Sequence, residues 1–308
     1  MSVIKTWEAV PNRLEQFWLY LAVNAPKGLP KSDLEQLFSP PSLGKAGEGG
    51  EREAGGNIFT AVLSELQALG FVKRIKEDDD SIVPFLPPDG KKSLEQKRQW
   101  FYEELRRILT TPGEAQEKGQ DDVPLALAWV TLQSPDQPIF MGVPKSVEIR
   151  SAFPDNENMF GLNTDASLRQ CYYWARYLGL CIFSAGKDGQ ILVPDSTAAV
   201  RSLLPAIFAG ESQLAASVFL SRLGGFCPVL ERGEARRIIL SQAARPGDFP
   251  GEDELSGSTS LAMLRLEAKG VIGLDDRSDA IETCMIDLCS HKRRFSHVRM
   301  ERKSHGNA

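Results

Sequence analysis

The stretches LQALGFVKRI at residues 66–75 and LEAKGVIGLDD at residues 266–276 decide the expected fold, because one pattern occurs near both ends of the chain. In each, an apolar helical pattern ends at a glycine, and a short apolar stretch and an acidic turn follow. Gly70 and Gly270 can adopt the left-handed conformation that ends a helix. Both stretches therefore predict a helix followed by a β-hairpin.

The two regions also agree before these glycines. Pro30 lies 40 residues before Gly70, and Pro228 lies 42 residues before Gly270. Each proline lies between two apolar helical patterns, and a loop rich in glycine and proline precedes the third helix. Three helices followed by two short strands are typical of a winged helix-turn-helix. We therefore expect the two regions, residues 12–85 and 211–288, to superpose.

Finer assignments follow from the same patterns. Asn12 and Asn57 are placed to cap the first and third helices of the first region. The last region is expected to contain helices at 214–223, 231–242 and 261–268, and strands at 271–274, 281–286 and 295–300. The loops 40–56 and 244–257 should be mobile, because their glycines, prolines and charges cannot bury apolar surface.

The middle of the chain contains a more divergent copy of the pattern. An amphipathic helix is expected at 93–109 and a buried helix at 125–132. From Asp165 onward the sequence predicts a helix, a break at Gly179, and two strands around the glycine-rich turn 186–189. This order indicates a third winged unit.

The expected fold class is thus α+β, with tandem winged helix-turn-helix domains, two clear and a divergent third between them. The expected domains are an N-terminal winged-helix domain at 1–90, a middle helical or divergent winged-helix domain at 91–209, and a C-terminal winged-helix domain with a basic tail at 210–308.

Charge and cysteine content narrow the class of protein. The 308 residues carry a net charge of −5, which argues against a protein that coats nucleic acid non-specifically. The run 292–303 contributes +5, from six cations and one Glu, so the remaining residues carry −5 − 5 = −10. Five cysteines without a Cys-x-x-Cys motif, no signal peptide and no apolar run of membrane length predict a cytoplasmic protein with reduced thiols and no membrane contact.

Histidine content argues against an enzyme. The only three histidines are His291, His297 and His305, so the first 290 residues have no imidazole base and no imidazole metal ligand. Most Ser-His and Cys-His nucleophiles and most zinc hydrolase sites are thereby excluded from the main body. We predict no catalytic residues, no cofactor and no metal.

Three other constellations lack what their chemistry requires. Cys284, Cys289, His291 and His297 do not have the usual spacing of zinc ligands. Asp89 with Glu95 and Lys97 imitates a metal-dependent nuclease signature, but the last two lie in the first turn of an expected helix. Gly44-Lys45 lacks the strand and the hydroxyl residue of a phosphate-binding loop.

Cations on the expected third helices, hairpins and C-terminal run are the candidates for DNA contact, because Lys and Arg make most phosphate contacts. Gln170 is a further candidate base reader on the middle third helix. The candidate cations are Arg169, Arg176, Lys187, Arg265, Lys269, Lys292, Arg293, Arg294, Arg299, Arg302 and Lys303. The alternative for each is an ordinary solvated face or tail.

The third helix of the first region differs from the others. Residues 57–69 contain no Lys or Arg, and their only charge is Glu65, which DNA would repel. We expect this unit to bind protein or to form a homodimer, with Glu65 and Gln67 facing the partner.

LQALGFVKRI, YWARYLGLCIF at 173–183 and FSHVRM at 295–300 together resemble the DpdG family. The resemblance implies a cytosolic accessory component of bacterial gene clusters that insert 7-deazaguanine derivatives into DNA and restrict foreign DNA. It implies larger helicase-like and nuclease-like partners from the same defence system, and it supplies no catalytic motif.

The sequence therefore predicts a non-catalytic adaptor that binds proteins of such a system and also DNA. Two alternatives stay open: a dimeric winged-helix transcription regulator, and a winged-helix subunit of an SMC-like complex that extrudes DNA loops.

Overall fold

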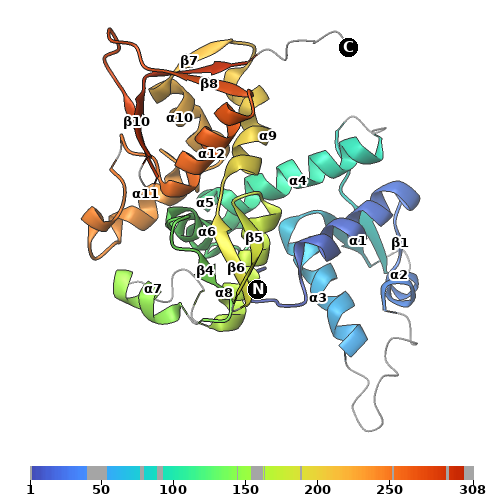
Figure 1. The fold of residues 1–308 in the computed structure, drawn as a ribbon. Helices are drawn as coiled ribbons and strands as arrows, with labels where there is room; N and C mark the ends of the chain where they lie inside the picture. Colours follow the sequence, from blue (N-terminus) through green and yellow to red (C-terminus); the bar gives the residue numbers. More distant parts are fainter. Residues whose placement is uncertain are drawn as a thin grey trace.

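Helices and small antiparallel sheets alternate along the chain in the computed structural model of this protein (Figure 1), which confirms the expected α+β class. The structure describes residues 2–39, 54–76, 80–88, 93–143, 145–153, 162, 164–187, 189–251, 253–288 and 291–301.

The first region combines three helices with a three-stranded sheet. Its elements are α1 (Pro11–Asn24), β1 (Leu29–Pro30), α2 (Lys31–Phe38), α3 (Ala54–Leu69), β2 (Val72–Ile75) and β3 (Ser81–Pro84). The strands lie in the order β1-β3-β2, with antiparallel pairings. Gly70 has a φ of +85° and ends α3 as expected. Asn12 lies inside α1 and Asn57 inside α3, so neither stands at the expected position before its helix. Pro11, whose fixed φ suits a first helical position, begins α1.

The second region repeats this order after a helical connection. The connection consists of α4 (Leu94–Thr110), which begins with a capping box at Ser93, and α5 (Pro112–Glu117). The repeated elements are α6 (Val123–Leu132), β4 (Ile139–Phe140), α7 (Ser146–Ala152), α8 (Asp165–Tyr177), β5 (Cys181–Gly186) and β6 (Gly189–Pro194). The strand order is β4-β6-β5, again antiparallel.

The third region begins earlier than the sequence indicated. Its elements are α9 (Thr197–Phe208), β7 (Gln213–Ala215), α10 (Ala216–Phe226), α11 (Glu234–Ser241), the 3-10 turn η3 (Pro246–Asp248), α12 (Gly257–Ala268), β8 (Ile272–Asp275), β9 (Cys284–Leu288), β10 (His291–Phe295) and β11 (His297–Met300). Leu214 lies in β7, so the expected first helix at 214–223 is wrong in its start. The apolar spacing of Leu214 and Val218 runs through a strand of three residues, which is too short to show alternation.

The end of this region also differs from expectation. The sheet order is β7-β11-β8, so the closing strand is β11, and β9 and β10 form a separate hairpin. The order helix, strand, helix, helix, strand, strand therefore runs from 197 to 300, with α11 and the hairpin inserted, and not from 211 to 288. Pro30 and Pro228 are not equivalent, because Pro30 precedes α2 whereas Pro228 follows α10. The domain boundaries at 90 and 209 stay predictions, and α9 packs against α10 and α12.

The segment 244–257, which we expected to be mobile, is anchored at its C-terminal end. Leu255 is buried, and its backbone N–H donates to the carbonyl of Met285 at 2.9 Å. Ser256 Oγ donates to the buried Glu231 at 2.6 Å, and Phe249 contacts the ring of Phe153. These contacts anchor Phe249, Leu255 and Ser256, whereas most other described residues of the segment are exposed, and its mobility stays a prediction. Of the other expected loop, 40–56, residues 40–53 lie outside the described residues, and residues 54–56 belong to α3.

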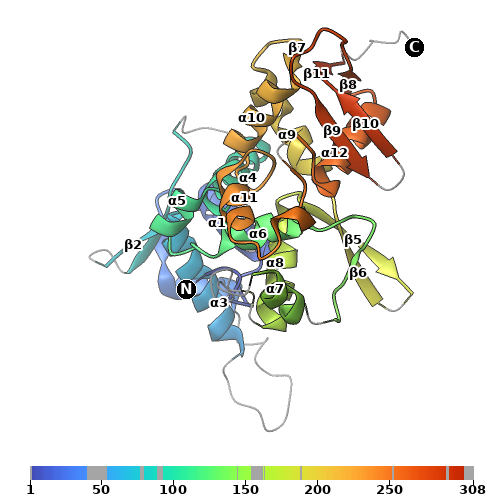
Figure 2. The same ribbon diagram turned by 90° about the vertical axis from the view of Figure 1, so that its left-hand side faces the viewer.

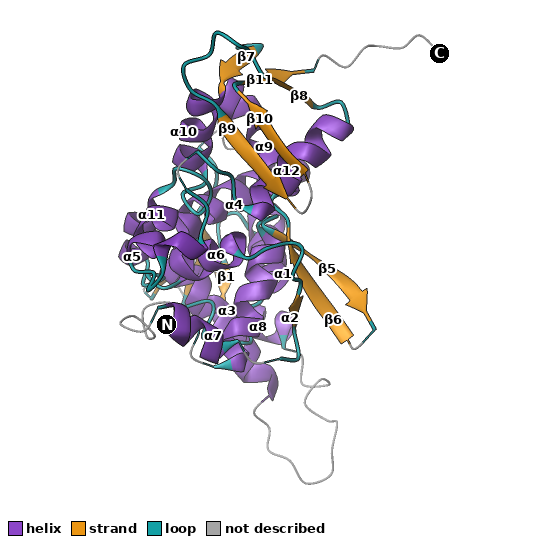
Figure 3. Cartoon of the chain, turned by 60° about the vertical axis from the view of Figure 1, so that its left-hand side comes forward, coloured by secondary structure: helices purple, strands orange, loops and turns teal. Residues whose placement is uncertain are grey.

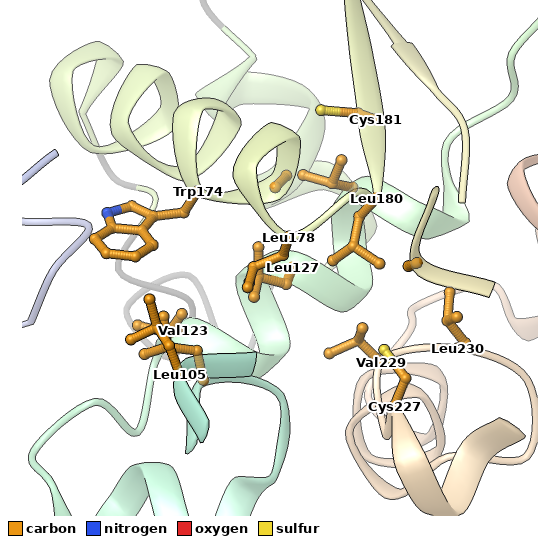
Figure 4. Packing of buried hydrophobic residues seen from close by; sticks show 14 of the residues in the cluster. Leu105, Val123, Leu127, Trp174, Leu178, Leu180, Cys181, Cys227, Val229 and Leu230 are labelled. Atoms are coloured by element: carbon orange, nitrogen blue, oxygen red, sulfur yellow. The ribbon is translucent and has the colours of Figure 1, made fainter. Parts of the chain in front are cut away.

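Helix α6 forms the centre of the molecule. All ten of its residues are buried, because VPLALAWVTL has no polar face, and it contacts α4, α8, α11 and α12. Figure 4 shows Trp174 of α8 and Leu178, the residue after α8, in the same apolar layer as Val123 and Leu127 of α6. The expected buried helix is confirmed, and its packing fixes which face of α8 points outward.

Candidate nucleic-acid interface

Three of the candidate cations, Arg176, Arg265 and Lys269, line one groove together with Arg201. The groove has a volume of about 980 Å³ and lies between the ends of α8 and α12, strand β5 and the exposed face of α9. Figures 2 and 3 show the β5–β6 hairpin and the β9–β10 hairpin on the same side of the molecule, with α12 beside them. We call it the basic groove, after its cations Arg176, Arg201, Arg265 and Lys269.

The charge of the basic groove is nearly uncompensated. Its only lining carboxylate among the described residues is Asp195, which forms an ion pair with Arg265. Arg176, Arg201 and Lys269 have no carboxylate within ion-pair distance in the part of the chain that the structure describes. Three cations in a concave surface attract phosphate oxygens, and low-dielectric walls strengthen that attraction.

Packing on the inner face of α8 directs its cations outward. Cys171, Trp174 and Leu178 are buried at helical spacing, so Arg169, Tyr173 and Arg176 lie on the opposite face. The guanidinium of Arg176 lies over the ring of Phe183, 5.0 Å from its centroid.

A tight turn brings α9 to the end of α8. Gly179 has a φ of +76°, and a Cβ there would lie 2.8 Å from the backbone N of Ala199. Only glycine allows this approach, which places Arg201 across the basic groove from Arg176. The sequence patterns did not single out Arg201, although it is the only charged residue of a mainly apolar helix.

Arg169 lies in a second concavity beside the basic groove. This aromatic hollow has a volume of about 660 Å³ and is lined by Phe140, Met141, Gly142, Val143, Arg169, Tyr173, Gly189 and Gln190. Lys187 is exposed at the tip of the β5–β6 hairpin. The structure therefore places Arg176, Arg265 and Lys269 in the basic groove, Arg169 in the aromatic hollow and Lys187 at the tip of the hairpin.

Gln170 is not available as a base reader. It is buried, and its Nε2 donates to the carbonyl of Thr6 at 3.1 Å and to that of Ala9 at 3.4 Å. The interpretation of Gln170 as a reader was wrong, because its place on α8 faces the N-terminal segment.

The model of the DpdG-like family matches residues 1–280. The chain belongs to the DpdG-like family. No curated protein and no solved structure matches it. Among the described residues, no helix is both long and apolar enough to cross a membrane.

All cations of the basic groove lie within the part that matches the DpdG-like family, whereas the C-terminal basic run lies after it. That run is not a tail as far as the structure describes it, since residues 291–295 form β10 and residues 297–300 form β11. Arg302 and Lys303 lie outside the described residues.

Most described cations of the run have acidic partners. Lys292 pairs with Asp287 at 2.7 Å and Arg293 pairs with Glu267 at 2.6 Å. Arg299 lies 2.9 Å from Glu301 and 3.5 Å from Asp275. Arg294 is exposed and has no ion pair among the described residues. Cross-strand and neighbouring carboxylates thus offset much of the charge that appeared unbalanced in the sequence.

The one charged residue of the expected third helix of the first region, Glu65, is turned inward rather than presented to a partner. Glu65 is buried and accepts hydrogen bonds from Thr6 Oγ1 at 2.8 Å and Gln120 Nε2 at 3.1 Å. Loss of hydration on burial raises the pKa of this carboxyl, although both hydrogen bonds act in the opposite direction. Glu65 therefore joins the N-terminal segment to the α5–α6 connection, and our expectation that it faces a protein partner was wrong.

The structure describes only part of the three motifs that resemble a zinc site, a nuclease signature and a phosphate-binding loop. Asp89, Cys289 and Gly44-Lys45 lie outside the described residues. Lys97 Nζ donates to the carbonyl of Ala22 at 2.7 Å, which ties α4 to the end of α1. Cys284 is buried in β9, opposite Phe295. Within the described ranges, no three His, Cys, Asp or Glu side chains lie close enough together to hold a metal ion.

Proposed function

We propose that this chain is a non-catalytic, cytoplasmic adaptor of a bacterial 7-deazapurine DNA modification and restriction system, and that it binds DNA through the basic groove. Membership of the DpdG-like family suggests a role in that modification system. The observation that carries the DNA-binding part is the set of three cations without ion pairs among the described residues, Arg176, Arg201 and Lys269, in one concave surface.

The proposal treats the three regions as winged-helix units. Each has the order helix, strand, helix, helix, strand, strand, interrupted in the third region by α11 and the β9–β10 hairpin. Each three-stranded sheet has the order first, last, second. In this arrangement α3, α8 and α12 occupy the place of the helix that contacts DNA in many winged-helix proteins. Of these helices, α8 exposes two arginines, and α12 contributes Arg265 and ends at Lys269. The exposed residues in the part of α3 whose side chains the structure describes, Thr60, Ser64 and Ala68, carry no charge. DNA contact therefore falls to the second and third units.

The first unit is the proposed contact for proteins of the same system or for a second copy of the chain. Trp7 is 66% exposed, and Leu37 and Phe85 are also exposed. Exposed aromatic and apolar side chains of this kind are enriched where proteins bind one another.

The test is a DNA-binding titration of wild type and a triple variant, Arg176→Ala, Arg201→Ala and Lys269→Ala. The variant should bind every duplex sequence more weakly. Its log–log salt dependence should flatten by roughly 0.9 for each phosphate that the variant no longer neutralises. The matched control replaces the exposed Lys27, Lys73 and Lys76 of the first unit by Ala, which removes the same charge.

If the two triple variants lose the same affinity, the effect reflects net charge alone, and DNA binding through the basic groove is refuted. An unchanged affinity in the groove variant, with an unchanged unfolding temperature, would also refute it. The non-catalytic part has a separate test: the purified chain should leave DNA and ATP intact in Mg²⁺. Cleavage that Glu95→Ala abolishes would contradict it.

A further inference from the structure

Two aromatic rings are exposed in the aromatic hollow, beside the basic groove. Phe140 in β4 is 43% exposed and Tyr173 on α8 is 38% exposed. Aromatic rings usually stabilise a protein by being buried, so exposed rings in a concave surface indicate a ligand that covers them.

The backbone that carries Phe140 is held in place by hydrogen bonds. Phe140 pairs with Ile191 of β6, and the N–H of Met141 donates to the carbonyl of Gln190 at 3.1 Å. The N–H of Val143 then donates back to the carbonyl of Phe140 at 3.1 Å. These bonds form a turn that keeps Phe140 at the rim of the hollow.

The aromatic hollow adjoins the basic groove, because a ring that lines one contacts a ring that lines the other. The ring of Tyr173 lies against Phe183, with 5.7 Å between centroids, and Phe183 lies beneath the guanidinium of Arg176. Arg169, Tyr173 and Arg176 follow one another along one exposed face of α8, so a cation lies on each side of the tyrosine ring. A ligand can therefore contact a charge, a ring and a second charge in succession.

We propose that this face binds single-stranded DNA, with an unpaired base stacked on Tyr173 and Phe140 and the neighbouring phosphates in the basic groove. The inference rests on the proposed DNA binding and names the form of DNA. Bases stack on exposed aromatic side chains, and cationic grooves follow the backbone of a single strand. In a duplex the faces of the bases are already covered by their neighbours, so the two rings would have nothing to stack on.

The charge of the hollow favours DNA over a protein partner. Among its described lining residues Arg169 is the one charged side chain, and none is acidic. The lining acid of the adjoining basic groove, Asp195, is neutralised by Arg265. A surface that is cationic and aromatic complements a strand of phosphates and bases along its whole length.

The experiment compares a fluorescein-labelled oligothymidylate of about 12 nucleotides with a duplex of the same length, at fixed salt. Wild type should bind the single strand more tightly. Tyr173→Ala and Phe140→Ala should each weaken single-strand binding roughly tenfold and leave duplex binding unchanged. Tyr173→Phe keeps the ring and should bind as wild type does. Phe226→Ala removes an exposed ring that lines neither concavity and should have no effect.

A second measurement does not depend on folding of a variant. Ultraviolet cross-linking of an oligothymidylate that contains 5-iodouracil should modify the tryptic peptide 170–176, which includes Tyr173. A cross-link confined to peptides that contain neither Tyr173 nor Phe140 would overturn the inference.

The outcomes separate this inference from the function on which it rests. If duplex binding depends on the basic groove but Tyr173→Ala has no effect on either DNA, stacking is refuted and DNA binding survives. Absence of binding to both DNAs refutes both. If Tyr173→Ala releases a protein partner and leaves single-strand affinity unchanged, the hollow is a protein site and the inference is wrong.

Discussion

Arg265 on α12 forms an ion pair with Asp195, which lies between β6 and α9 and is 3% exposed. Oδ1 of the same carboxylate accepts the N–H of Thr197 at 2.9 Å, at the start of α9. Near the other end of α12, Ser258 Oγ lies 2.6 Å from Ser196 Oγ. Helices α9 and α12, which border the basic groove, are therefore linked at two places, and Asp195 forms one of these links.

Replacing Asp195 by Asn should lower the free energy of unfolding by about 1–3 kcal/mol, because Arg265 would be left without its buried charged partner. Urea unfolding of wild type and variant measures the decrease. The control is Asp275→Asn, whose partner Arg299 lies 3.5 Å away on the surface, and which should cost less than about 1 kcal/mol. Similar decreases in both variants would show that Asp195 has no special role.

Glu65 should give the stability a pH dependence of a particular sign. Burial raises the pKa of this carboxyl in the folded protein, so the folded state binds its proton more tightly than the unfolded state does. The contribution of Glu65 is therefore most favourable in acid, and it declines as the pH rises from its unfolded pKa to its folded pKa. Unfolding of wild type and Glu65→Gln between pH 4 and pH 8 should show the wild type losing stability relative to the variant. A relative stability that does not change with pH would contradict the assignment.

Two adjacent glycines in α10 should respond to alanine in opposite directions. A Cβ at Gly224 would lie 2.4 Å from the carbonyl O of Glu231, whereas a Cβ at Gly225 meets nothing within 4 Å. Gly224→Ala must displace backbone and should cost about 1–3 kcal/mol of stability. Gly225→Ala should be stabilising by up to about 1 kcal/mol, because alanine favours a helix over glycine. Thermal or urea unfolding measures the stability of both variants. A Gly225→Ala variant less stable than Gly224→Ala would contradict the packing of α10 described above.

Cys227 should resist alkylation until the protein unfolds. It is fully buried, and burial raises the pKa of its thiol to about 12, so both access and thiolate are lacking near neutral pH. Mass spectrometry after iodoacetamide treatment at pH 8 should find Cys227 unmodified in the native protein and modified in guanidinium chloride. Rapid native labelling would mean that the α10–α11 segment opens.

The sequence by itself determined the local features that depend on near neighbours. Gly70, Gly179 and Gly270 each have a positive φ after a helix, as the pattern of helix, glycine and strand indicated. The apolar stretch of α6 had to be buried, because it has no polar face. These features follow from backbone sterics and from hydrophobic periodicity, which a sequence displays directly.

Only the tertiary structure decided which polar side chains remain exposed. Glu65 and Gln170 occupy helix faces that the N-terminal segment covers, and nothing within either helix indicates that cover. Arg293 and Arg299 find carboxylates through strand pairing and helix packing, whereas Arg201 faces an open groove. Exposure and ion pairing depend on which distant segments pack together, and here those segments lie up to 164 residues apart in the chain. The sequence could therefore name cations, but only the packing of α8, α9 and α12 brought four of them to one surface.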